Sequence, residues 1–223
     1  METVKYSSGR SYGQFCGLAR ALDVVGDRWN LLIVRELLPG PMRYSELKTS
    51  LAGIATNLLA QRLRSLEEDG IIERRLGDVG VLYALTPWGV GLREPMEALG
   101  RWGAPLMMTG RDGDSFQPRW LVLALPALLR DVRATPALEL GFEIEGFLIV
   151  LHIDENGPRV VVQPDRAPGT ILKAAPEIIV GLAAGGLTID QATSAGRVQG
   201  DPKVLNRAFP AGRATPAPPT GSC

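Results

Sequence analysis

Residues 44–70, YSELKTSLAGIATNLLAQRLRSLEEDG, decide how the first half of the chain folds. The segment predicts a short helix over 45–51, a break at Gly53 and a longer helix over 57–69. Thr56 suits the N-cap of the longer helix because its hydroxyl can accept a hydrogen bond from a free backbone N–H. Two helices joined by such a tight connection form a helix-turn-helix unit.

The longer helix separates an apolar face from a polar face when its residues are placed about 100° apart. The apolar face holds Leu59, Leu63 and Leu66. The opposite face holds Asn57, Gln61, Arg64 and Glu68. Amide and guanidinium groups pair with adenine and guanine edges in a major groove, so this face is a candidate for reading DNA. The same residue types are also ordinary on any solvated helix face.

Upstream of this unit the pattern predicts two helices. The first covers 15–25, with Leu18, Ala21, Leu22 and Val25 on one apolar face. The second covers 28–38, with Asp27 at its N-cap, and Pro39-Gly40 ends it.

Downstream of Gly70 the pattern changes to strands. Residues 71–76 and 81–85 are strand-like, and 77–80 form a tight turn, which makes a hairpin or wing. Thr86-Pro87 then opens a last helix that runs to about residue 107, with Thr86 at the cap and Pro87 at the first helical position. The first half therefore predicts a mainly α winged helix-turn-helix domain over 1–108.

The candidate DNA contacts divide into two groups. Residues in the N-terminal turns of the longer helix are expected to contact base edges, because this part of a recognition helix enters the major groove. Phosphate contacts fall to residues on its flanks, to the short helix and to the first wing strand, where at most one of two successive arginines faces DNA. The full set is Arg43, Ser45, Thr56, Asn57, Gln61, Arg62, Arg64, Ser65, Arg74 and Arg75.

The second half mixes strands and helices. Residues 109–118 form a polar, Gly- and Pro-containing linker, and 119–210 predict a smaller α+β domain. The tail of 211–223 is rich in Pro and small residues and is expected to be disordered. Within the domain, strands are expected over 137–145, 147–154, 158–163 and 170–172, and helices over 176–184 and 203–209, the last with Asp201 at its cap.

Composition excludes several classes. The net charge is zero, which argues against a protein that coats nucleic acid, but not against one that gathers its positive charge on one face. Two cysteines, Cys16 and Cys223, are too few for a disulfide scaffold or a zinc site, and the lone histidine, His152, has no paired nucleophile. We therefore expect no enzyme, cofactor or metal, and a cytoplasmic protein with no membrane segment.

The residues assembled so far resemble a known family. The run CGLARALDVVGDRWNLLIVRELLPGPMRYSELKTSLAGIATNLLAQRLRSLEEDGIIER, followed by YALTPWG, is similar to the HxlR-type winged-helix regulators, relatives of the MarR group. The resemblance covers about residues 12–107. Its landmarks are Cys16, the Gly26–Trp29 step, the Tyr44–Leu47 step and the leucine spacing that ends at Gly70.

This resemblance implies a transcription regulator that binds double-stranded DNA as a homodimer, with the first and last helices of the domain at the dimer interface. It implies a palindromic operator whose half-sites lie about 34 Å apart. In some relatives the cysteine at the position of Cys16 senses oxidants, so Cys16 is a candidate redox sensor. A buried cysteine that only packs is the alternative. The wing turn of 77–80 is short, which places deep groove contact by its tip in doubt.

The segment IIVGLAAGGLTIDQATSAGRVQGDPKVLNRAF resembles the closing part of sterol-carrier-protein-like domains, with Gly196, Arg197, Gly200 and Asp201 in the shared phrase. The resemblance covers roughly residues 136–210 and implies a sheet-and-helix layer around an apolar cavity. It suggests that the domain binds an apolar small-molecule effector or supports the dimer. The alternative is a small-molecule or lipid-binding protein in which the winged helix mediates association.

Overall fold

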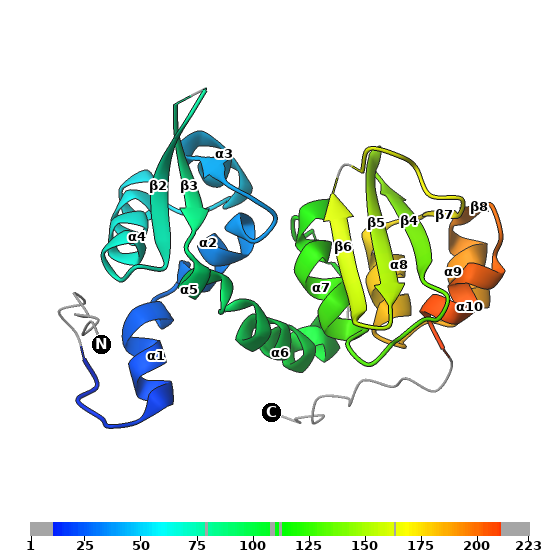
Figure 1. Cartoon of the computed structure of the whole chain (residues 1–223), viewed down its shortest axis with the longest axis horizontal. Helices are drawn as coiled ribbons and strands as arrows, with labels where there is room; N and C mark the ends of the chain where they lie inside the picture. Colours follow the sequence, from blue (N-terminus) through cyan, green and yellow to red (C-terminus); the bar gives the residue numbers. More distant parts are fainter. Residues whose placement is uncertain (1–10, 79, 108–109, 112, 163, 211–223) are drawn as a thin grey trace. The chain divides into compact units, whose positions relative to one another are not determined.

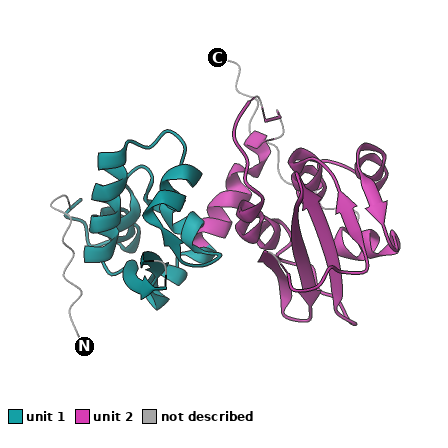
Figure 2. Ribbon diagram, turned by 90° about the horizontal axis from the view of Figure 1, so that it is seen from above, with its two compact units in different colours: residues 1–94 teal, residues 95–223 magenta. Residues whose placement is uncertain are grey.

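The computed structural model describes residues 11–78, 80–107, 110–111, 113–162 and 164–210. The chain forms two compact units, Met1–Glu94 and Pro95–Cys223 (Figure 2). This division lies inside a helix and precedes the predicted linker of 109–118, so the second unit is the longer one rather than the smaller. The predicted tail of 211–223, with Cys223, lies outside the described residues.

Unit 1 is a helical domain with a small antiparallel sheet, as predicted (Figure 1). Its elements in chain order are α1 (Gly17–Val25), α2 (Asn30–Leu37), β1 (Met42–Arg43), α3 (Tyr44–Ser50), α4 (Thr56–Glu68), β2 (Ile72–Gly77), β3 (Gly80–Leu85) and α5 (Pro87–Val90). The helix α6 (Arg93–Gly103) begins at the boundary between the units.

The core of unit 1 forms around the apolar stripe of α4. Leu59, Leu63 and Leu66 are at most 1% exposed, which confirms the inward face predicted from their spacing. Helices α2 and α3 contribute Ile33, Val34, Leu37 and Leu47 to the buried residues of the unit. Each fully buried leucine or isoleucine contributes about 1.5–3 kcal/mol of transfer free energy, so this stripe fixes the rotation of α4 about its axis.

The wing is an antiparallel hairpin, as expected. Strands β2 and β3 pair from Ile72↔Leu85 to Gly77↔Gly80. Strand β1, which the sequence pattern did not indicate, adds to the other edge of β3 and gives the order β1-β3-β2. The wing is therefore anchored to the start of α3 as well as to the end of α4.

Several predicted helix ends were wrong. Asp27 does not cap α2: the helix begins at Asn30, and Trp29 at the cap position has a left-handed backbone with φ of 87°. Helix α4 begins at Thr56 itself, and its cap position, Ala55, makes no side-chain hydrogen bond.

The predicted last helix over 87–107 is not continuous. Thr86 does cap it, since its hydroxyl accepts a hydrogen bond from the Gly89 N–H at 3.1 Å. However, α5 ends at Val90, and Gly91 and Leu92 form a turn before α6. A 3-10 turn, η1 (Ala104–Met107), follows α6. The two glycines, Gly89 and Gly91, lower the helix propensity of this segment, which explains the interruption.

Unit 2 holds a five-stranded mixed sheet of order β6-β5-β4-β7-β8. After α6 and η1, its elements are η2 (Pro118–Trp120), α7 (Leu121–Leu128), β4 (Leu138–Ile144), β5 (Phe147–Asp154), β6 (Gly157–Val162), β7 (Ile171–Lys173), α8 (Pro176–Ala183), α9 (Ile189–Ala195), β8 (Arg197–Gln199) and α10 (Lys203–Ala208). Strands β4, β5 and β6 form a meander, and β7 pairs parallel to β4.

The predicted strands and the two predicted helices are present within one or two residues of their expected ends. Helices α7 and α9 and strand β8 were not predicted. Asp201 accepts a hydrogen bond from the Lys203 N–H at 2.9 Å at the start of α10, which matches its expected capping role, although Pro202 occupies the cap position.

The sheet of unit 2 has one apolar and one charged face. The apolar face meets residues of α7, α8, α9 and α10 in a single core whose fully buried members include Leu140, Phe142, Ile149 and Leu151. The other face carries Glu139, Glu143, His152, Arg159 and Lys173. The lone histidine lies on that face, where His152 Nδ1 is 3.3 Å from Glu139 Oε1. Among the described residues, no helix is long and apolar enough to cross a membrane.

Substitution of Gly89 by alanine is expected to destabilise unit 1. A Cβ at Gly89 would lie 2.1 Å from the Ile71 carbonyl oxygen, which is main chain and cannot move aside. We expect a loss of about 3 kcal/mol in the free energy of unfolding, measured by urea denaturation. Gly17→Ala, where no atom lies within 4 Å of the added Cβ, is the matched control. Equal unfolding midpoints for both variants would contradict the close approach.

Candidate nucleic-acid interface

The exposed face of α4 begins at its first residue. Thr56, Asn57, Gln61 and Arg64 are all exposed, on the side of the helix opposite the buried leucines. The side-chain Oδ1 of Asn57 accepts a hydrogen bond from the Leu58 N–H at 2.9 Å. Arg64 Nε donates to the Ala60 carbonyl at 3.3 Å, one turn earlier in the helix. The structure therefore brings together the predicted base-reading side chains.

Two hydrogen bonds hold α3 and the turn before α4 in place. The Tyr44 hydroxyl donates to the Thr56 carbonyl at 2.8 Å, which ties the start of α3 to the start of α4. Lys48 Nζ donates to the Ile54 carbonyl at 2.6 Å, inside the connecting turn. Tyr44 is one of the family landmarks, but neither of these two contacts was predicted, because neither residue type signals a hydrogen bond to a carbonyl several residues further along.

This arrangement brings the start of α3 beside the start of α4. Arg43 and Ser45, both exposed, flank Tyr44 and therefore lie near Thr56 and Asn57. The Glu46 carboxylate accepts from the Arg43 N–H at 2.6 Å and caps α3. In addition, Arg43 Nη2 lies 3.4 Å from Glu46 Oε1.

The wing arginines point to different sides, as their alternation predicts. Arg74 Nε is 2.8 Å from Glu67 Oε1 on α4, and this carboxylate raises the pKa of Arg74. Arg75 pairs with Glu73 at 2.6 Å, two residues earlier on the same face of the strand. Both pairs are exposed, and exposed ion pairs contribute only about 0–1 kcal/mol. A phosphate can therefore replace either carboxylate at little cost.

Arg62 differs from the other predicted phosphate contacts. Its guanidinium pairs with Asp27, which precedes α2, and its side chain is only 17% exposed. Ser65, the other flanking residue, is half-buried.

Cys16 lies exposed at the start of α1 and forms no disulfide. It occupies the N-cap position without a side-chain capping hydrogen bond, and the nearby backbone N–H groups of Ala19 and Leu18 lower the pKa of its thiol. The sulfur is therefore accessible and its thiolate is favoured, which is the environment of a reactive cysteine rather than of a packed one.

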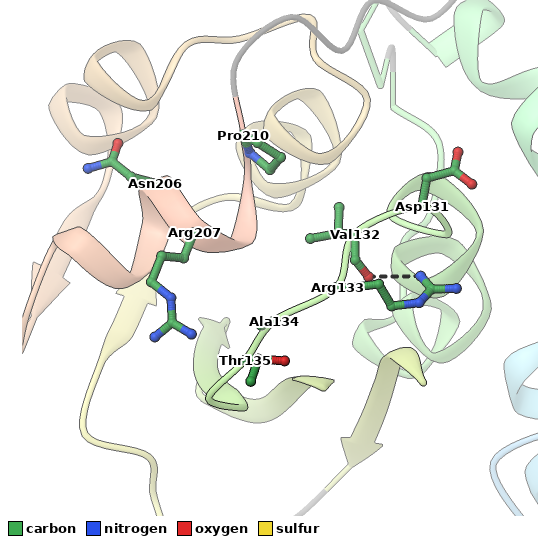
Figure 3. A pocket seen from close by; sticks show the side chains of 8 residues that line it. All are labelled: Asp131, Val132, Arg133, Ala134, Thr135, Asn206, Arg207 and Pro210. Carbon is green, nitrogen blue, oxygen red and sulfur yellow. Dashed lines mark hydrogen bonds between the residues drawn. The ribbon is translucent and has the colours of Figure 1, made fainter. Parts of the chain in front are cut away.

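A second region of interest is a pocket in unit 2 with a volume of about 720 Å³. It lies between the segment that follows α7 and the end of α10 (Figure 3). Arg133 Nη1 donates to the Arg130 and Val132 carbonyls at 2.6 and 2.9 Å, and Arg207 Nη2 donates to the Pro136 carbonyl. Among the described residues, neither guanidinium has an acidic partner. Val132 and Ala134 supply its apolar, buried part.

Three features of unit 1 define a class of protein: a short helix, a tight turn and an exposed polar helix followed by an antiparallel hairpin. They make it a winged helix-turn-helix protein. The family model described as HxlR-like helix-turn-helix matches residues 24–110. The chain belongs to the HxlR-like helix-turn-helix family of transcriptional regulators, which are not enzymes.

The sequence similarity to the following known proteins extends over less than half of the chain. The HTH-type transcriptional regulator YodB of Bacillus subtilis is 35% identical over 85 residues, which are 37% of this chain and 76% of YodB. The uncharacterized HTH-type transcriptional regulator YtfH of Escherichia coli is 35% identical over 97 residues, 42% of this chain and 77% of YtfH. The solved structure of quinone-bound YodB covers 39% of this chain and 93% of that chain, with 34% identity and a TM-score of 0.36.

Cys16 is expected to react with iodoacetamide at lower pH in the folded protein than in the unfolded one. Its folded pKa is lowered, so the thiolate forms earlier as the pH rises. The measurement is the alkylation rate as a function of pH in a Cys223→Ser background, in buffer and in urea. A midpoint in buffer at or above the urea value would contradict the role of the Ala19 and Leu18 amides.

Proposed function

We propose that the chain is a sequence-specific transcription regulator that reads double-stranded DNA with the first two turns of α4. The observation that carries this proposal is the outward orientation of Asn57, Gln61 and Arg64, which follows from the burial of the leucine stripe behind them. A helix of 13 residues is about 20 Å long and fits a major groove about 12 Å wide. The family membership of the chain supports the same function.

The polar side chains of the first turns of α4 and of its neighbours have proposed roles. Asn57 and Gln61 can pair with adenine through two hydrogen bonds, and Arg64 with the O6 and N7 atoms of guanine. Thr56, Ser45 and Arg43 lie near the N-terminus of the helix and would contact phosphates, as would Ser65, Arg74 and Arg75 from its flank and the wing.

We also propose that the protein acts as a homodimer on a palindromic operator. In α1 and the segment before it, Phe15, Leu18 and Leu22 are exposed at i, i+3 and i+7 and form one apolar face. In α6 and η1, Leu99, Trp102 and Leu106 repeat the same spacing and are also exposed. The resemblance to the family assigns both helices to a dimer interface, and exposed apolar faces of this kind are typical of interaction surfaces.

For unit 2 we propose a sterol-carrier-like domain that receives a small-molecule effector. The resemblance phrase is consistent with this, since Gly196 to Asp201 span β8 and lead into α10. Gly200 has φ of +93°, and a Cβ there would lie 2.0 Å from the Gly169 carbonyl, so glycine is required. The interior is filled by side chains rather than open, so the pocket beside Arg133 and Arg207 is the candidate site. Its lining holds two arginines against one carboxylate, Asp131, and this excess of positive charge favours an anionic group on an apolar body.

Two other roles follow from specific observations. The exposed, low-pKa thiol of Cys16 favours redox control as a second input, because it lies next to the proposed dimer face of α1. The alternative of a lipid-binding protein in which the winged helix only mediates association requires the α4 face to be covered by protein. In unit 1 this face is exposed, which favours DNA as its partner.

The double substitution Gln61→Ala plus Arg64→Ala is expected to weaken specific binding by at least about 2 kcal/mol, roughly thirtyfold, because it removes two base-pairing side chains. The measurement is a salt titration of binding to DNA upstream of the protein's own gene, with random DNA for comparison. Arg159→Ala, on β6 of the other unit, is the matched control for loss of one arginine. Absence of any preferred sequence in a random-sequence selection would overturn the proposal and favour lipid binding.

Leu18→Glu plus Leu22→Glu is expected to convert a dimer into a monomer, because each substitution would bury a carboxylate in an apolar interface. Size-exclusion chromatography with light scattering at tens of micromolar gives the mass directly. Leu76→Glu, an exposed apolar residue of the wing that is 90% accessible, is the matched control and should leave the mass unchanged. A native protein that is monomeric in solution would refute the proposed interface.

A further inference from the structure

The segment between α1 and α2 contacts two separate parts of unit 1. Asn30 is buried, and its Nδ2 donates to the Val24 carbonyl at the end of α1 at 3.1 Å. Trp29 reaches the turn before α4, since a Cβ at Gly53 would lie 3.9 Å from Trp29 Cη2. The segment of residues 26–30 therefore touches α1 and the helix-turn-helix turn at once.

The backbone of this segment is held in an uncommon conformation. Trp29 has φ of 87°, in the left-handed region that residues with a Cβ rarely adopt and that costs about 1–3 kcal/mol. The Arg28 guanidinium lies 5.7 Å from the centroid of the Trp29 ring. Such a conformation persists only where the surrounding contacts determine it. The uncommon conformation of Trp29 therefore indicates that the contacts around the 26–30 segment determine its path.

Asp27 forms an ion pair with Arg62 across 35 positions of the sequence. Position 62 follows Leu59 by three residues and precedes Leu66 by four, so it borders the inward face of α4. This explains why the Arg62 side chain is largely covered and why its Nε is buried without a hydrogen-bond partner among the described residues. Asp27 is half-exposed, so the charge that stabilises this covered guanidinium lies at the surface of the domain.

The Asp27–Arg62 pair differs in kind from the wing pairs. Loss of Asp27 would leave the largely covered Arg62 guanidinium without its compensating charge, which costs more than the loss of a partner from an arginine that is itself exposed. Arg62 is also the immediate neighbour of Gln61 on α4. A change at Arg62 therefore shifts or loosens the turn of the helix that carries the base-reading amide.

We infer that Asp27 and Arg62 form a positioning pair that fixes the exposed face of α4 relative to α1 and α2. Arg62 serves the helix through Asp27 and does not act as a phosphate contact. The inference rests on the proposal that α4 reads DNA. Asp27 acts through Arg62. Substitution of either residue should therefore cause the full loss of DNA affinity, and substitution of the second residue should cause no further loss.

The test compares Asp27→Asn, Arg62→Met and the double variant. Methionine retains the apolar stem of Arg62 and removes its guanidinium, both the charge and the N–H donors. The first readout is operator affinity across a range of salt concentrations, and the second is unfolding by urea without DNA. We expect each single variant to lose roughly tenfold or more in specific affinity, and the double variant to lose no more than either single. The slope of log affinity against log salt stays that of the native protein, because no phosphate contact is lost.

Two results would overturn the inference. The first concerns the slope of log affinity against log salt. If its magnitude falls by about 0.9 in Arg62→Met while Asp27→Asn keeps native affinity, Arg62 contacts a phosphate, because this is the change expected from one lost phosphate contact. The second is an additive double variant in urea, which would mean that the residues do not act as a pair. Glu67→Gln, which breaks the exposed pair with Arg74, is the control and should retain specific binding. If no DNA binding is found at all, the proposed function fails, and the urea cycle still decides the pair.

Discussion

The burial of Leu59, Leu63 and Leu66 is the constraint on which the rest of unit 1 depends. These side chains fix which side of α4 faces the core, so the opposite side of the helix is directed outward. Other interactions determine which elements lie beside this exposed face. They are the hydrogen bond from the Tyr44 hydroxyl to the Thr56 carbonyl and the pairing of β2 with β3. The orientation of the exposed polar face therefore follows from the burial of three leucines on the other side of the helix.

Much of this arrangement could be predicted from local sequence pattern. Helix α4, the wing and strands β4 to β6 all have clear periodicity or glycine-marked turns, and each was found within one or two residues. The exposed set of Asn57, Gln61 and Arg64 followed from the same periodicity. Local pattern is reliable in these places because the interactions that shape each element lie within it.

The features that the sequence did not indicate depend on distant partners or lack periodicity. Asp27 is a residue type that commonly caps helices, yet its carboxylate forms an ion pair with an arginine 35 positions away. Helix α7 is apolar on nearly every side and contains Pro126, so no amphipathic period marks it. Strands β1 and β8 are two and three residues long, and each pairs with only one other strand, β3 and β7 respectively. Each case requires knowledge of tertiary neighbours.

The pairing of the arginines around α4 has a consequence for how the protein would search a genome. Arg43, Arg74 and Arg75 already have carboxylate neighbours, so an approaching phosphate must exchange with an existing partner instead of meeting a bare cation. Such exchange returns less free energy per contact than the neutralisation of an isolated charge. If α4 reads DNA as proposed, binding to random sequence would be somewhat weaker for this reason, and a long-lived complex would depend more on hydrogen bonds to the correct bases. Internal charge compensation in this way limits time lost on the wrong sites.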